Sequence, residues 1–203
     1  MSAYPPTRPL AHVYDSAYQS VPNWDIGRPQ RPFVYLVEAG LVRSPVLDVG
    51  CGTGELSMFL ARQGYEVLGI DIAPSAVSRA REKARWRRID AAFLVWDALY
   101  LGRLAERGFS FATVLDSAMF HVLRDDERDR LVDGLGTIVE RGGLYCVLGD
   151  ARGDDRTEYG ITPEEIRRRF EQAGGWSVEF SYRTAFERRY STNDAYFVGV
   201  RRR

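Results

Sequence analysis

Short apolar segments alternate with amphipathic segments along this chain, and this alternation constrains its fold more than any other feature of the sequence. Parallel neighbouring strands need a crossover connection of a dozen or more residues, usually a helix, whereas antiparallel strands can be joined by a short loop. The repeated change from a strand pattern to a helix pattern therefore predicts an α/β fold. We expect a doubly wound, mostly parallel sheet with helices on both faces.

The boundaries of the expected elements follow from apolar periodicity and from the placement of Pro and Gly. Pro74 and Pro163 stand at helix starts, and Gly142 is expected to end a helix. The last two strands have only a loop between them, so they should pair antiparallel at one edge. The expected strands are 46–49, 66–71, 92–96, 111–115, 144–148, 176–182 and 195–200, and the expected helices are 33–41, 55–63, 74–87, 126–139 and 162–174.

The N-terminal part differs in composition from the rest of the chain. Residues 1–10 contain three prolines and are predicted to form a mobile tail. Residues 11–32 hold aromatic side chains among Pro and Gly, so this stretch is too apolar for a linker and too broken for a long helix. We expect residues 1–203 to form a single domain, with residues 11–44 as a flap that folds over it.

Charge and cysteine content exclude several classes of protein. The 28 basic residues balance the 28 acidic ones, whereas binding to a phosphate backbone runs on an excess of Lys and Arg. No apolar run approaches the roughly 18 residues needed to cross a bilayer. Cys51 and Cys146 are too few for a disulfide scaffold, and no signal sequence is visible at the start. The sequence predicts a cytoplasmic protein that binds neither nucleic acid nor membranes.

A glycine-rich turn follows the first expected strand and is the strongest functional signal. It reads Asp48-Val49-Gly50-Cys51-Gly52-Thr53-Gly54-Glu55, and Asp71 ends the next strand. Glycines permit positive φ and let a ligand approach bare backbone, and ligands of open α/β sheets bind at the carboxyl ends of the strands. A carboxylate at the end of the second strand can accept both ribose hydroxyls. An adenosine-bearing ligand is therefore expected.

The spacing of the glycines distinguishes between adenosine ligands. In a G-x-G-x-x-G dinucleotide fingerprint the third glycine would fall on Glu55 or Ser57, and neither fits. A pyrophosphate needs the positive end of the helix dipole, where Glu55 places a negative charge. S-adenosylmethionine carries no phosphate, and Asp48 suits its ammonium group. A nicotinamide-dependent (NAD-type) oxidoreductase and a cofactor-binding protein without turnover remain as alternatives.

With these motifs, the sequence resembles the class I S-adenosylmethionine-dependent methyltransferases over about residues 40–200. The resemblance implies a seven-stranded sheet with an antiparallel last strand, and an adenine contact for Asp97. The alternative for Asp97 is that it only caps the next segment, and Cys51 is expected to be a small turn residue rather than a nucleophile. The cofactor-binding residues implied in this part of the chain are Asp48, Gly50, Cys51, Gly52, Gly54, Asp71, Ile72, Asp97, Ala98 and Asp116.

The flap contains a second motif. Trp24, Gly27 and Gln30 resemble the W-x-x-G-x-x-Q segment of the thiopurine, thiol, halide and tellurite methyltransferase branch. By that resemblance Trp24 lies over the cofactor and Gln30 helps to hold its methionine end. The alternative is that Trp24 simply anchors the flap to the core. Methyl transfer by in-line displacement favours such a lid, because alignment of the reactants lowers the barrier.

The segment after the fourth strand bears on the acceptor. It reads Asp116-Ser117-Ala118-Met119-Phe120-His121 and lacks the N-P-P-Y or D-P-P-Y motif of relatives that methylate DNA bases or protein glutamine. We assign Asp116 and His121 to catalysis, with His121 as a base for a phenol, hydroxyl or thiol. A structural histidine at a helix start is the alternative. Asp116 and Asp150 as cation ligands are less favoured, so no metal is predicted.

A cluster of basic residues on the helix 74–87 is the remaining signal. RNA binding is one interpretation, but a solvated helix face fits the zero net charge better. We therefore expect methyl transfer from S-adenosylmethionine to a thiol or hydroxyl group of a small aromatic or heterocyclic molecule. The protein is expected to be a monomer or a weak homodimer.

Overall fold

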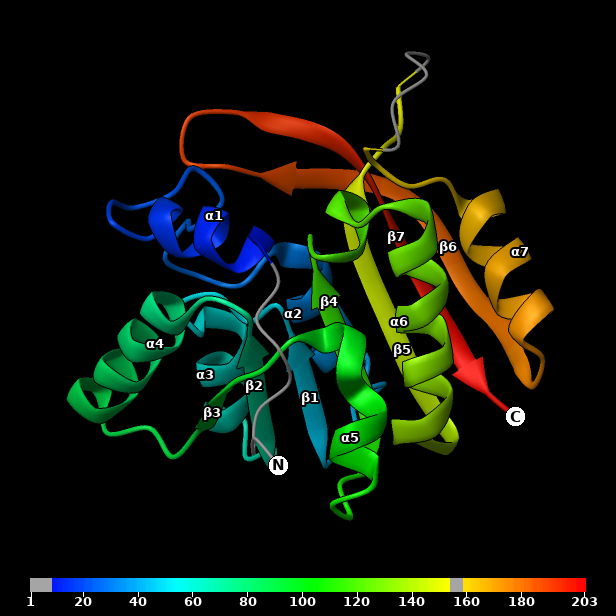
Figure 1. The fold of residues 1–203 in the computed structure, drawn as a ribbon, viewed down its shortest axis with the longest axis horizontal. Helices are drawn as coiled ribbons and strands as arrows, with labels where there is room; N and C mark the ends of the chain where they lie inside the picture. Colours follow the sequence, from blue (N-terminus) through cyan, green and yellow to red (C-terminus); the bar gives the residue numbers. More distant parts are fainter. Residues whose placement is uncertain (1–8, 154–158) are drawn as a thin grey trace.

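One seven-stranded sheet organises the protein. The structure is a computed structural model that describes residues 9–153 and 159–203 (Figure 1). The strands are β1 (Val46–Val49), β2 (Val67–Asp71), β3 (Ala92–Val95), β4 (Phe111–Ser117), β5 (Val139–Asp150), β6 (Trp176–Glu187) and β7 (Thr192–Arg202). The α-helices are α1 (Pro9–Ala17), α2 (Arg31–Glu38), α3 (Glu55–Arg62), α4 (Pro74–Arg87), α5 (Leu101–Ala105), α6 (Asp125–Ile138) and α7 (Pro163–Ala173). Two short 3-10 helices are η1 (Ala98–Tyr100) and η2 (Phe120–Val122).

The order of the strands confirms the predicted fold class. It is β3-β2-β1-β4-β5-β7-β6, with parallel pairing from β3 to β5. The last strand, β7, lies between β5 and β6 and is antiparallel to both. The strand order reverses at β1, so the loops that follow the carboxyl ends of β1 and β4 run in opposite directions. In such sheets a crevice forms between these loops.

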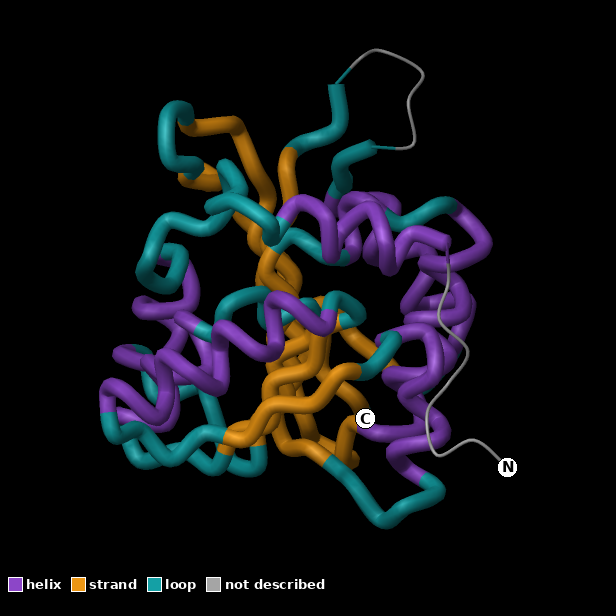
Figure 2. Tube along the Cα trace, turned by 60° about the vertical axis from the view of Figure 1, so that its left-hand side comes forward, coloured by secondary structure: helices purple, strands orange, loops and turns teal. Residues whose placement is uncertain are grey.

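Helices cover both faces of the sheet (Figure 2). On one face, α5, α6 and α7 pack on apolar side chains such as Leu47 and Val114. On the other face, α2 and α3 pack on Val46 and Leu115. Successive strand residues point to opposite faces, so these short strands are buried on both sides, as their continuous apolar character predicts. No helix within the described ranges is long and apolar enough to cross a bilayer.

Gly142 and Gly143 do not end a helix, and this prediction was wrong. Helix α6 ends at Ile138 and β5 begins directly at Val139. Gly142 has φ +74° inside the strand, and a Cβ at Gly143 would lie 2.7 Å from the carbonyl oxygen of Glu140. The register with β4 shifts across this point. The glycines therefore bend a long strand, a role that glycine has at bulges.

The two ends of the chain also differ from prediction. Residues 1–8 of the expected tail lie outside the described ranges, whereas Pro9 and Leu10 belong to α1. The hairpin of β6 and β7 is longer than the expected strands 176–182 and 195–200. It reaches past the sheet toward the loop after α1, where the backbone N–H of Arg189 donates to the carbonyl of Asn23 over 2.8 Å (Figure 1). Both segments thus meet above the carboxyl ends of β1 and β4.

Candidate functional site

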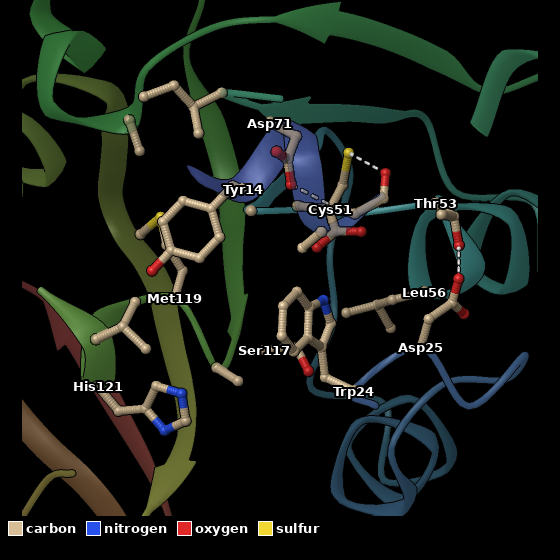
Figure 3. Close-up of a pocket in the computed structure, with 18 of the residues that line it drawn as sticks. Tyr14, Trp24, Asp25, Cys51, Thr53, Leu56, Asp71, Ser117, Met119 and His121 are labelled. Atoms are coloured by element: carbon tan, nitrogen blue, oxygen red, sulfur yellow. Dashed lines mark hydrogen bonds between the residues drawn. The ribbon is translucent and has the colours of Figure 1, made fainter. Parts of the chain in front are cut away.

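A cavity of about 500 Å³ lies at the carboxyl ends of β1 to β4, beneath α1 and the loop that follows it (Figure 3). It is lined by eleven of the residues singled out from the sequence. They are Trp24, Gln30, Asp48, Gly50, Cys51, Gly52, Asp71, Ile72, Asp97, Ala98 and His121. Gly54 and Asp116 do not line it.

The glycine turn forms one wall and is held by the strands beside it. The N–H of Cys51 donates to the carbonyl of Ile70 in β2 over 2.9 Å. Gly52 has φ +54°, and a Cβ there would lie 3.0 Å from the hydroxyl oxygen of Tyr18. Gly54 has φ +82° and a Cβ there would lie 2.7 Å from the ring of Phe93. Gly52 therefore keeps the cavity wall bare, whereas Gly54 lets α3 approach β3.

Three buried carboxyl groups lie at the carboxyl ends of the first three strands: Asp48 is in β1, Asp71 ends β2 and Asp97 comes just after β3. Asp48 accepts a hydrogen bond from Ser57 Oγ over 2.6 Å, and burial raises its pKa to about 7. Asp71 accepts the N–H groups of Gly52 and Ala73, each over 2.9 Å, and burial raises its pKa as well. Two of its lone pairs are thus used to fix the turn, and the others can accept ribose hydroxyls.

Asp97 performs the capping role that was its alternative assignment, and it also lines the cavity. Its carboxylate accepts the N–H of Leu99 over 3.0 Å at the start of η1. Ile72 and Ala98 follow Asp71 and Asp97 along the chain and give this side of the cavity an apolar surface. An adenosine group, with hydroxyls at one end and a flat base at the other, fits this combination of acids and apolar side chains.

Cys51 is a neutral turn residue in this structure. Its thiol lies 3.7 Å from the carbonyl oxygen of Gly52, and the position of a Cβ on Gly69 would be 3.0 Å from its sulfur. Burial raises the pKa of the Cys51 thiol, and Asp48 and Asp71 raise it further. A thiolate nucleophile is therefore disfavoured here.

The roof of the cavity is tied together by polar contacts between the N-terminal segment and the glycine turn. Trp24 Nε1 donates to the hydroxyl of Tyr18 over 3.2 Å, and the two rings meet edge to face. Thr53 Oγ1 donates to Asp25 Oδ2 over 2.8 Å. Lys83 of α4 donates to Thr53 Oγ1 over 2.7 Å and lies 3.8 Å from Asp25.

Glu55 lies at the start of α3, as the sequence argument requires, but its charge is paired. Lys83 lies 2.8 Å and Arg87 2.7 Å from its carboxylate oxygens. The negative charge that disfavours a pyrophosphate is thus partly neutralised. The glycine spacing, rather than Glu55, carries the distinction between the two kinds of ligand.

Gln30 joins the roof to the hairpin. Its Nε2 donates to the carbonyl of Glu187 over 2.7 Å and its Oε1 accepts the N–H of the same residue over 3.0 Å. Arg28 adds an ion pair of 2.7 Å to the Glu187 carboxylate. The Gln30 amide thus pairs with both backbone groups of Glu187, as a neighbouring strand would. Gln30 also borders the cavity.

Asp116 lies beneath the cavity and holds the loop that borders it. Its carboxylate accepts the N–H groups of Met119 and Phe120 and the hydroxyl of Tyr145, over 2.8, 3.2 and 3.0 Å. Burial raises its pKa to about 7. Ala118 is held at φ +70° between these bonds, a conformation that side chains other than glycine rarely adopt. Asp116 therefore acts on the cavity through the backbone of 117–120.

His121 begins a second wall, made of aromatic and basic side chains. Its Nδ1 accepts the backbone N–H of Asp150 over 2.9 Å. Its ring lies 4.9 Å from that of Tyr159 and 6.1 Å from that of Phe186, between centroids. Burial lowers the pKa of His121 well below its ordinary value. The ring is therefore neutral, with its proton on Nε2.

Three further residues are functional candidates. From the sequence, Asp150 is considered only as a cation ligand, and Arg188 and Arg128 have no assigned role. Asp150 is buried and accepts bonds from Tyr159 and Arg188. Arg128 of α6 is 1% exposed and donates to the carbonyls of His121 and Gly160, each over 3.1 Å. The sequence could have pointed to Asp150, because an acid at the end of a strand is often functional. Nothing in the sequence distinguishes Arg128 from the other charged residues of its amphipathic helix.

Within the part of the chain that the structure describes, no cluster of three or more His, Cys, Asp or Glu side chains is placed to hold a metal ion. Asp116 and Asp150, the pair considered as cation ligands, are each engaged by the groups named above. The cavity lies where the strand order reverses and combines buried acids, a glycine turn and apolar walls. This combination is typical of a doubly wound protein that binds an adenosine-bearing small molecule.

Comparisons with known proteins name the family. The methyltransferase domain family matches residues 46–143. An uncharacterized methyltransferase of Schizosaccharomyces pombe is 33% identical over 103 residues, which are 51% of this chain and 69% of that protein. A structure solved for the conversion of a disulfide bond into a thioacetal group during echinomycin biosynthesis is 31% identical, with a TM-score of 0.83, over 95% of this chain and 92% of that one. The chain belongs to the class I S-adenosylmethionine-dependent methyltransferases, and S-adenosylmethionine is its cofactor.

A further relative has a named acceptor. The 2-heptyl-1-hydroxyquinolin-4(1H)-one methyltransferase of Mycobacteroides abscessus is 29% identical over 150 residues, or 70% of this chain. The match spans 65% of that protein's own length. Family membership favours the methyltransferase over the NAD-type oxidoreductase that the fold also allows.

Proposed function

We propose that this methyltransferase transfers the methyl group to a thiol or hydroxyl group of a small aromatic or heterocyclic molecule by in-line displacement. The observation that carries the proposal is the second wall of the cavity, where His121, Tyr159, Phe186 and Arg188 border the same space as the glycine turn. Aromatic side chains favour a flat acceptor ring, since offset or edge-to-face ring pairs are stabilising.

Two further observations support the proposal. The segment Trp24 to Gln30 resembles the thiopurine, thiol and tellurite branch, and the M. abscessus relative is named for a hydroxylated heterocycle. We also infer that residues 11–44 form a flap over the cofactor within a single domain, because Trp24 and Gln30 border the cavity.

The chain's own residues position the reactants and exclude water. S-adenosylmethionine supplies, when bound, an electrophilic methyl group on a sulfonium. Asp48, Asp71 and Asp97 supply the acceptors for its polar ends, and Asp116 fixes the loop between the two walls. Alignment of two reactants can contribute about 7–11 kcal/mol to lowering a barrier, so these residues need no covalent step.

A labelled methyl donor tests this function. The protein is incubated with donor labelled in the methyl group and with matched pairs of acceptors: phenol and cyclohexanol, thiophenol and cyclohexanethiol. We expect label in the aromatic members and little or none in the saturated ones. Label that enters the saturated members as readily as the aromatic ones, or no label after prolonged incubation while the donor is bound, would contradict the proposal; the second result would indicate a binding protein without turnover.

A further inference from the structure

The second wall of the cavity carries a consequence for the charge of the acceptor. His121 lies on the side of the cavity away from Asp71 and Cys51 (Figure 3). Within the described ranges, four charged or titratable groups face it: Asp150 from β5, Arg128 from α6, Arg188 just after β6, and Tyr159. Its direct hydrogen-bond partner is a backbone group, the N–H of Asp150.

A backbone N–H can only donate, so His121 Nδ1 must accept and the proton of the neutral ring must be on Nε2. In this state His121 presents a hydrogen-bond donor through Nε2 and has no free lone pair with which to remove a proton. The low pKa of the buried ring is consistent with this neutral form. His121 can thus donate a hydrogen bond from Nε2 to an oxygen or sulfur atom of a bound molecule.

Among the described residues, the carboxylates that border the cavity lie elsewhere. Asp25 accepts Thr53 Oγ1 in the roof, and Glu55 is paired with Lys83 and Arg87. Asp48, Asp71 and Asp97 belong to the side of the glycine turn, and each already accepts a hydrogen bond. In the described part of the chain, the second wall therefore offers hydrogen-bond donors and the Arg188 guanidinium to a bound molecule, and the buried Asp150 carboxylate pairs with that cation from behind the wall.

Arg188 supplies that cation in a fixed place. Its guanidinium carbon lies 5.0 Å from the centre of the Phe186 ring. Its Nη2 donates to Asp150 and, over 3.0 Å, to the hydroxyl of Tyr159. Both bonds to described side chains come from Nη2, which leaves Nε and Nη1 to donate to a bound molecule. Asp150, 2% exposed, keeps an Oδ1 that lacks a hydrogen-bond partner among the described residues.

We propose that the acceptor binds as a preformed anion, the oxyanion or thiolate of an acidic aromatic or heterocyclic hydroxyl or thiol, held by the Arg188 guanidinium and the Nε2–H of His121. The proposal rests on the proposed function and narrows its substrate class. The acceptor loses its proton to solvent before it binds. Its anionic oxygen or sulfur then forms the new bond to the methyl carbon as the carbon–sulfonium bond breaks, and the bonding electrons remain on the departing sulfur.

The spectrum of bound 4-nitrophenol tests the proposal directly, because its phenol and phenolate forms absorb at different wavelengths. The protein, saturated with S-adenosylhomocysteine, is titrated with 4-nitrophenol at several pH values. We expect the bound phenolate to be favoured about tenfold over its population in water, as an opposite charge within a few ångströms produces. Bound neutral 4-nitrophenol, or no binding, would overturn the proposal.

Variants separate the charge from the fold. Arg188→Met should abolish the preference for the phenolate, and Arg188→Lys should restore part of it. Arg189→Met is the matched control, because its exposed side chain lies over Tyr190, and it should bind 4-nitrophenol like the unaltered protein. An unchanged phenolate preference in Arg188→Met would remove Arg188 from the proposal.

The rate of methyl transfer distinguishes this inference from the function on which it rests. For 4-nitrophenol and phenol, the pH at which the rate levels off should follow the pKa of each acceptor. If the rates with both acceptors instead level off at the same pH, and this dependence disappears in His121→Phe, a protein base removes the proton. That result would overturn this inference but leave the proposed function in place. Phenolate that binds without being methylated would instead count against the proposed function.

Discussion

Asp71 illustrates how one side chain serves both the fold and the site. Its two carboxylate oxygens accept backbone N–H groups on either side, one in the glycine turn and one ahead of α4. The same carboxylate borders the cavity where a ribose is expected. Removing it leaves two N–H groups without their acceptor and opens the turn that forms the wall.

Asp71→Ala should weaken the binding of S-adenosylhomocysteine by about 1–3 kcal/mol, because the bound ribose hydroxyls lose the carboxylate that accepts their hydrogen bonds. Titration calorimetry measures this change. Asp90→Ala, at an exposed acid in the loop before β3, is the control and should bind as the unaltered protein does. Equal affinities of the two variants would remove the ribose assignment from Asp71.

Asp116 makes the stability of the protein depend on pH. Its pKa is about 7 in the folded protein against an ordinary value of 3.8, because the group is fully buried. Between these two values the folded state holds the proton more strongly than the unfolded state does. Its contribution to stability is therefore full below 3.8 and is lost as pH rises toward 7.

Asp116→Asn removes this titration while keeping an acceptor for Met119 and Phe120. The stability of the variant relative to the unaltered protein should rise as pH increases across that window. Each kcal/mol corresponds to about 2–4 °C in melting temperature for a chain of this size. Thermal melting at several pH values gives the difference, and parallel curves for the two proteins would contradict the assignment.

At the scale of elements, local patterns predicted most of the fold. The alternation of strands and helices and the pairing of the last two strands were all visible in the periodicity. The bend at Gly142 was not, because a glycine pair after an amphipathic run also fits a helix end. The reach of the β6–β7 hairpin depends on contacts with Asn23 and Gln30, which no local pattern encodes.

The polar contacts around Lys83 form a latch between α4 and the N-terminal segment. Lys83→Met removes the donor to Thr53 and the charge near Asp25. Lys83 keeps part of its side chain in solvent, and ion pairs near the surface contribute about 1 kcal/mol each, so global stability should change little. The roof should open more often, which faster limited proteolysis after residues 18–30 and a higher KM for the cofactor would report.

Arg85→Met is the control for this latch, since Arg85 is an exposed basic residue of the same helix. It should leave both proteolysis and KM as they are. If Lys83→Met behaves like Arg85→Met, the contacts seen around Lys83 do not hold the roof.

Arg128 couples α6 to the second wall. It donates to the carbonyls of His121 and Gly160 while its charge is paired with Glu165 over 2.7 Å. Arg128→Lys keeps a cation for Glu165 but cannot make the fork of bonds to both carbonyls. The KM for the acceptor should rise several-fold with the affinity for S-adenosylhomocysteine unchanged. Equal losses at both ligands would indicate a purely structural role.

At the scale of the whole molecule, the two sides of the cavity differ in how far the sequence predicted them. Asp48, Asp71 and Asp97 lie at the carboxyl ends of β1, β2 and β3, so the rules of parallel sheets bring them together. The second wall draws His121, Tyr159 and Arg188 from three distant loops. Its composition depends on loop lengths and on the buried Arg128, and loops of this fold vary with function.

Methyl transfer in this cavity requires that the two walls serve one reaction. A crystal structure of the protein with S-adenosylhomocysteine and 4-nitrophenol tests this most directly. We expect the adenosine beside Asp71 and Asp97, and the nitrophenol ring beside Phe186 with its oxygen within hydrogen-bond distance of His121 Nε2 and Arg188. A nitrophenol ring bound away from the second wall, with its oxygen contacting neither side chain, would contradict the account.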